Sequence, residues 1–123
     1  ASVANNFRPA AVPKNYYKDA GVGLVFRPLA FRSSAIDVVA TRSEFAAQAP
    51  KYADIYTPTI IVASEADYVV STRRHARKLA TMLPAAELVT ATGTGHMPHR
   101  LRTDLVLTAI RRVNAMASAD SGG

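Results

Sequence analysis

The chain contains no cysteine among its 123 residues. This absence excludes disulfides, thiolate nucleophiles and cysteine-based zinc or iron–sulfur sites, and it is typical of the reducing cytoplasm, where we expect the protein. No run approaches the roughly 20 apolar residues that a membrane-spanning helix needs, so we expect no membrane partner. Hydrophobic residues make up 49% of the chain and charged residues 20%. This is the composition of one modest globular domain rather than of a disordered segment.

The sequence also lacks a basic tail. Its net charge of +6 divides evenly, because residues 1–56 carry seven basic and four acidic side chains and residues 57–123 carry eight and five. Proteins that bind nucleic acid usually concentrate positive charge on one face, so we expect no nucleic-acid partner. The chain opens on Ala1, without Met and without a signal segment, and we expect it to begin inside a longer sequence or after processing.

All aromatic residues except Tyr68 lie in residues 1–56, and four of the seven prolines lie there too. The prolines interrupt long helices, so short helices and turns with exposed aromatic faces are predicted. The best helix of this part is expected from about Ser34 to Gln48, where apolar residues recur close to helical spacing. We expect residues 1–56 to form a small helical layer and a linker.

Residues 57–117 have a more regular pattern. Thr59–Ala63 is a short β-branched run typical of a strand buried on both faces, and Glu87–Ala91 is a second strand. A helix is predicted between them, from about Thr72 to Leu83, and another beginning near Thr103. The pattern strand–helix–strand–helix indicates an α/β fold with a parallel pair of strands. Two parallel strands do not make an independent sheet, so their neighbours are expected outside this chain. Residues 118–123 are expected to form a flexible tail.

A carboxylate and an imidazole follow the two predicted strands. Asp67 lies four residues beyond Ala63, and His96 lies five beyond Ala91. Parallel strands place both loops at the same carboxyl edge of a sheet, where open α/β sheets bind ligands. A hydrogen bond between them would fix the tautomer of a histidine that works as a base. Glycines before His96 allow the tight turn that aims its ring into a cleft. Taken singly, Asp67 could instead be a turn-forming residue, and His96 could be a solvent-exposed loop residue.

The run from Ile55 to Met116 resembles the C-terminal end of the α/β-hydrolase superfamily. Pro58–Asp67 is similar to that family's strand and acid turn, and Leu83–Val89 to its link into the last strand. Gly93–His99 is similar to its histidine loop. The resemblance implies that Asp67 is the acid and His96 the base of a catalytic triad, in the family's chain order. Residues 1–54 are similar to the end of the helical cap that some members insert before that strand.

The sequence departs from the family's pattern in two places. Ser64 stands where the family commonly has glycine, and neither a Gly-x-Ser-x-Gly elbow nor an oxyanion-loop motif is present. The resemblance places both motifs before residue 1, so the chain would pair with the missing N-terminal part of the same fold and be inactive alone. It implies a cofactor-free hydrolase of small carboxylic esters or related acyl compounds. An aspartate nucleophile would instead give a dehalogenase or an epoxide hydrolase.

Other candidate residues have weaker signals. His99 follows His96 by three residues, but no carboxylate cluster accompanies them, so we expect no metal site and assign His99 to supporting the loop. The cationic face of Arg73, Arg74, Arg77 and Lys78, with His75 among them, is expected to be solvated. The aromatic side chains of the first half either line an acyl pocket or pack against each other (Tyr16, Tyr17, Phe26 and Phe31). The alternative to an enzyme is a non-catalytic interaction module that uses this basic helix and the aromatic surface.

Overall fold

The structure is a computed structural model that describes residues 3–120, except the side chains of Arg42 and Asp120. Contacts divide it into two compact units. One comprises the described residues of Ala1–Val12 and Ala53–Gly123, and the other is Pro13–Tyr52. The sequence predicts boundaries after residues 56 and 117. The structure differs in grouping the N-terminal segment with the C-terminal part of the chain.

A two-stranded parallel sheet forms the centre of the first unit. Strand β1 (Thr59–Ser64) pairs with β2 (Ala86–Ala91), with Thr59 opposite Ala86 and Ser64 opposite Ala91. Pro58 cannot donate a backbone hydrogen bond, so the strand begins after it, and the β-branched residues that follow favour extended backbone. The predicted parallel pair is confirmed, and the fold is mixed α/β.

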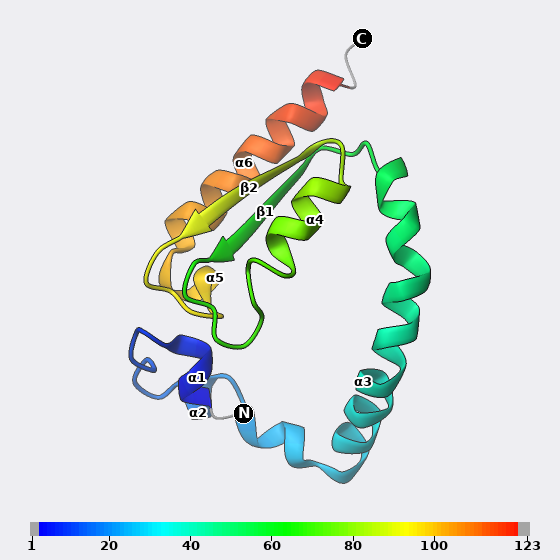
Figure 1. The fold of residues 1–123 in the computed structure, drawn as a ribbon. Coiled ribbons are helices and arrows are strands. Elements are labelled where there is room, and N and C mark those ends of the chain that lie inside the picture. Colours follow the sequence, from blue (N-terminus) through cyan, green and yellow to red (C-terminus); the bar gives the residue numbers. More distant parts are fainter. Residues whose placement is uncertain (1–2, 121–123) are drawn as a thin grey trace. The chain divides into compact units, whose positions relative to one another are not determined.

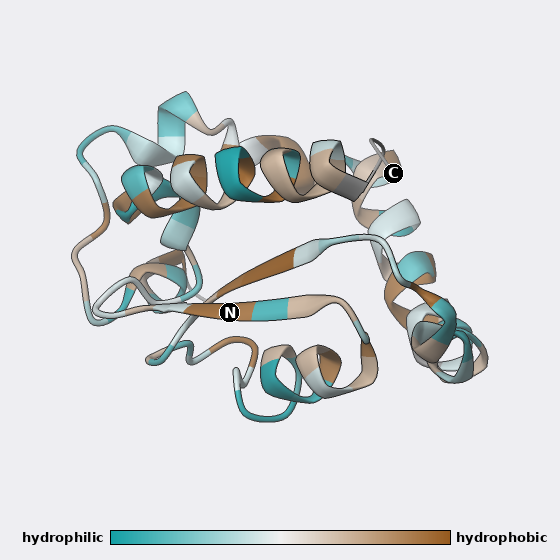
Figure 2. Ribbon diagram, turned by 90° about the horizontal axis from the view of Figure 1, so that it is seen from above, coloured by the Kyte–Doolittle hydropathy of each residue, from teal (hydrophilic) through white to brown (hydrophobic). Residues whose placement is uncertain are grey.

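Helices lie on both faces of this sheet (Figures 1 and 2). Helix α4 (Ala76–Met82) connects the strands and covers one face, and α6 (Thr103–Asp120) packs along the other. Helix α4 is shorter than predicted because residues 72–75 form a turn, in which the Thr72 hydroxyl donates to the Ser64 carbonyl at 2.5 Å. Helix α6 begins at Thr103 as predicted. It continues through residues 118–120, which we assigned to the tail; residues 121–123 of that tail lie outside the described part.

The strands are less buried than the sequence predicts. Along β1 and β2 only Ser64 and Ala91, at the carboxyl ends, are buried, and the other residues are half-buried. The reason is the width of the sheet, because β1 has no second neighbour in the described part of the chain. Buried apolar side chains are correspondingly few (Phe7, Leu83, Ala91 and Ala109).

Two short helices flank the carboxyl ends of the strands. Helix α1 (Val3–Phe7) belongs to the same unit as the sheet, and its last residue, Phe7, is fully buried. Helix α5 (Pro98–Leu101) follows the loop that leaves β2 and contacts β1. The N-terminal segment and the segment that follows β2 therefore meet at the edge of the sheet where the predicted site lies.

The second unit is helical and exposed. It contains α2 (Tyr16–Asp19), the 3₁₀ helix η1 (Val22–Phe26) and α3 (Pro28–Gln48), and the 3₁₀ helix η2 (Ala49–Asp54) leads out of it. Helix α3 starts six residues earlier than predicted, because Pro28 occupies the first turn, where proline is tolerated. Its apolar residues lie on all sides, and Val39 is 81% exposed. Tyr17, Phe26 and Phe31 are also mostly exposed. No helix between residues 3 and 120 combines the length and apolarity needed to cross a membrane.

Candidate functional site

Asp67 and His96 meet at the carboxyl edge of the sheet. Asp67 lies in the loop after β1, which ends at Ser64, and His96 lies in the loop after β2, which ends at Ala91. His96 Nδ1 and Asp67 Oδ2 are 2.8 Å apart, a hydrogen bond of ordinary length. The aspartate side chain is 11% exposed and the histidine ring 37%. The hydrogen bond that parallel pairing predicts is therefore present, with the acid mostly covered and the ring reachable from solvent.

The acid loop holds the other carboxylate oxygen through its own backbone. Asp67 Oδ1 accepts hydrogen bonds from the backbone N–H groups of Val69 and Val70, each at 2.8 Å. Ser64 at the start of this loop is 1% exposed, and its hydroxyl accepts the N–H of Ala66 at 3.3 Å. The serine thus adds a bond within the turn, and the aspartate reaches His96 from a backbone held at several points.

These contacts keep Asp67 ionised. Burial by itself raises the pKa of its carboxyl group, since desolvation penalises the charged form. The hydrogen bond to His96, the two backbone N–H groups and the charge interaction with His96 outweigh this effect, and the pKa lies below its usual value of 3.8. An ionised acceptor at Nδ1 favours the tautomer with its proton on Nδ1, which leaves the Nε2 lone pair available to accept a proton.

The histidine loop turns on two glycines with positive φ. Gly93 has φ +70° and Gly95 has φ +57°, a region that side chains other than glycine rarely adopt. Between them Thr94 is 2% exposed, and its hydroxyl has no hydrogen-bond partner in the described part of the chain. The glycine pattern predicted this tight turn, and the structure confirms it.

The N-terminal segment also touches this loop, a contact that the sequence analysis missed. The backbone N–H of His96 donates to the carbonyl oxygen of Asn6 at 2.8 Å. The Arg8 guanidinium lies 5.8 Å from the centre of the Tyr68 ring, next to Asp67 in the acid loop. No local pattern predicts these contacts, because the two segments lie far apart in the sequence.

The remaining candidates lie apart from this pair. His99 is exposed on α5, and its backbone carbonyl accepts the Thr103 hydroxyl at 2.9 Å. This bond does not involve its ring, so the support of the loop by His99 stays a prediction. His75 is exposed at the start of α4. The cationic face is exposed, as predicted (Arg73, Arg74, Arg77 and Lys78). Within residues 3–120 no three histidine, aspartate or glutamate side chains gather as metal ligands.

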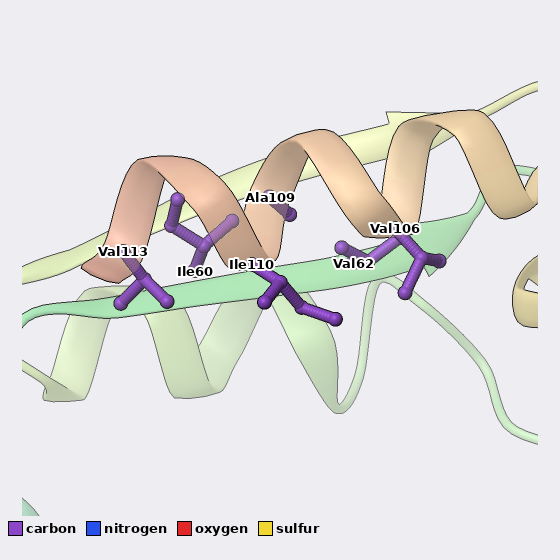
Figure 3. Close-up of a pocket in the computed structure, with 6 residues that line it drawn as sticks. All are labelled: Ile60, Val62, Val106, Ala109, Ile110 and Val113. Carbon is purple, nitrogen blue, oxygen red and sulfur yellow. The ribbon is translucent and has the colours of Figure 1, made fainter. Parts of the chain in front are cut away.

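An apolar groove of roughly 210 Å³ runs between β1 and α6 (Figure 3). Every side chain that lines it is aliphatic (Ile60, Val62, Val106, Ala109, Ile110 and Val113). Ile110 is 55% exposed, so the groove is open. It contains no group that could act on a substrate, and its chemistry is that of an uncovered core.

Comparison with protein-family models, with curated proteins and with solved structures finds no significant match for this chain. Asp67, His96 and the segments that hold them are therefore the features from which a function can be inferred.

Proposed function

We propose that this chain supplies the acid and the base of a hydrolase with a nucleophile–His–Asp triad, as the C-terminal part of an α/β-hydrolase fold. The observation that carries the proposal is the 2.8 Å hydrogen bond between Asp67 Oδ2 and His96 Nδ1, formed from adjacent loops at the carboxyl edge of a parallel sheet. Ionised Asp67 orients the ring, and His96 Nε2 takes the proton of the nucleophile and then gives it to the leaving group.

The nucleophile and the oxyanion donors come from a segment outside this chain, the missing N-terminal part of the same fold. The open side of β1 supports this division. The N–H groups of Thr59 and Glu65 bond to the β2 side, so by strand alternation those of Ile60 and Val62 point to the other edge, where no described strand pairs. The aliphatic groove beside that edge is the surface that a further strand and its helix would cover (Figure 3).

The proposed substrate is a small carboxylic ester or a related acyl compound. A serine nucleophile would attack the acyl carbon and leave an acyl-enzyme, which a water molecule activated by His96 would hydrolyse. If the nucleophile is an aspartate, the same Asp67–His96 pair would serve a dehalogenase or an epoxide hydrolase. No cofactor is required for any of these reactions.

The test is turnover of an aryl ester, a haloalkane and an epoxide by the protein that includes the preceding segment. We expect hydrolysis of one class, and a loss of several orders of magnitude in His96→Ala. His99→Ala is the matched control, since this neighbouring histidine is exposed and should affect turnover far less. Hydrolysis that survives His96→Ala, or the absence of hydrolysis with all three substrate classes, contradicts the proposal. In the latter case binding of a partner to the exposed basic face would favour an interaction module.

A further inference from the structure

The segment Asn6–Arg8 lies against both loops that carry the Asp67–His96 pair. Its first contact is the hydrogen bond from the His96 N–H to the Asn6 carbonyl, at 2.8 Å. This bond fixes the backbone of the very residue whose ring must meet Asp67. Because the ring is joined to this backbone through only Cα and Cβ, a shift of the backbone also shifts Nδ1.

The second contact lies at Gly95. A Cβ atom built on Gly95 would stand 2.2 Å from the Arg8 carbonyl oxygen and 3.0 Å from the Asn6 carbonyl oxygen. The backbones of the two segments therefore approach more closely than any side chain at position 95 allows. Gly93 in the same loop has nothing within 4 Å of such an atom. The requirement for glycine at position 95 thus arises from the N-terminal segment as well as from the turn.

The third contact reaches the acid loop. Arg8 places its guanidinium 5.8 Å from the centre of the Tyr68 ring, a cation–π distance, and Tyr68 directly follows Asp67. Phe7 is fully buried and anchors the segment between these two attachments. One short segment thus contacts the residue beside the acid and the backbone of the base.

We propose that Asn6, Phe7 and Arg8, together with Gly95, are positioning residues that hold the histidine loop at the distance where His96 Nδ1 meets Asp67. The inference rests on the proposed function for its catalytic meaning, and its physical content concerns the orientation of one ring. Arg8 acts through Tyr68, Asn6 through its carbonyl oxygen, and Phe7 through burial. None of them exchanges a proton with a substrate.

The test compares Gly95→Ala with Gly93→Ala in the ¹⁵N-labelled full chain. Both variants strain a residue with positive φ, but only the first forces the N-terminal segment away. We expect Gly95→Ala to lower the hydrogen-exchange protection of the His96 amide by about tenfold or more, and to remove the Nδ1–H tautomer signal from its ring nitrogens. Gly93→Ala should retain both signals. Equal effects of the two variants, or protection at β1 amides without protection at His96 in the unmodified chain, would overturn the proposal.

Arg8 provides a second, milder test, since its side chain is exposed and its replacement leaves the core intact. Arg8→Gln should lower protection of the His96 amide by about two- to fivefold, and Arg8→Lys, which keeps a cation, should restore most of it. An unchanged amide in Arg8→Gln contradicts the role of Arg8. These readouts do not depend on hydrolysis. If the His96 signals change in these variants while no substrate is hydrolysed, the proposed function fails and the positioning role stands. If hydrolysis occurs and the His96 signals do not change, the positioning role fails and the proposed function stands.

Discussion

Replacing Asp67 by asparagine or by alanine should separate the contribution of its hydrogen bonds from that of its charge. The carboxylate accepts three hydrogen bonds, from His96 at 2.8 Å and from the N–H groups of Val69 and Val70, also at 2.8 Å. Hydrogen bonds to a charged group contribute about 1.5–3 kcal/mol each when they are sheltered from water. Val69 and Val70 are 43% and 37% exposed, so water can replace their partner in the alanine variant.

We therefore expect Asp67→Ala to lower the free energy of unfolding by about 2–3 kcal/mol rather than by the full sum. In Asp67→Asn the amide oxygen can still accept from the two backbone N–H groups. The amide NH₂ can then donate to His96 Nδ1, once the ring proton has moved from Nδ1 to Nε2. This variant should lose only about 1 kcal/mol. The assay is urea unfolding at neutral pH, followed by the amide signals of β1 and β2.

The difference between the natural chain and Asp67→Asn should shrink in acid. The pKa of Asp67 in the folded chain lies below its usual value of 3.8, so as the pH falls the unfolded chain takes up this proton first. The stability that the ionised carboxyl group provides is thus present above that value and is lost as the pH falls through the lower, folded-state pKa. Asp104, whose pKa is also lowered, titrates in both proteins and cancels in the comparison. A difference that does not change with pH, or an asparagine variant less stable than the alanine variant, would refute the reasoning.

Three further outcomes are expected. The 123-residue chain alone should show negligible hydrolysis of an aryl ester, and turnover that persists in His96→Ala would reveal a different site. Because the groove beside β1 is open, the chain should self-associate in sedimentation, and Ile110→Lys should reduce the association; sedimentation of the wild-type chain as a monomer would contradict this. Arg112→Ala should change stability by less than about 1 kcal/mol, since its ion pair with Glu87 is half-exposed on both sides, and a larger loss in chemical denaturation would show that the pair is more sheltered.

The sheet and the Asp67–His96 pair could be predicted from the sequence because their signals are local. Thr59–Ser64 is rich in β-branched residues and follows a proline, and parallel pairing by itself brings the loops after both strands to one edge. The Asp67–His96 contact follows from that topology. The glycines before His96 likewise predicted a tight turn, and both adopt positive φ.

Other features depend on contacts that no local pattern encodes. Gly95 fits the predicted turn, but its second role, the close approach of the Arg8 carbonyl, involves a segment at the opposite end of the chain. The first six residues of α3 were missed because the apolar residues of this helix follow no single face, so helical periodicity gives no signal there. The burial of the strands was overestimated, since their composition is typical of a wider sheet than the described chain forms.

The hydrogen bond between Asn6 and His96 has a consequence for how the chain acquires its site. The two residues are 90 positions apart (96 − 6), so the segment around Asn6 cannot dock until the chain has been synthesised through His96. Contacts of such high sequence separation require a long loop to close before they stabilise anything, and they form late. The Asp67–His96 pair would therefore be oriented only at the end of folding, after both strands are in place.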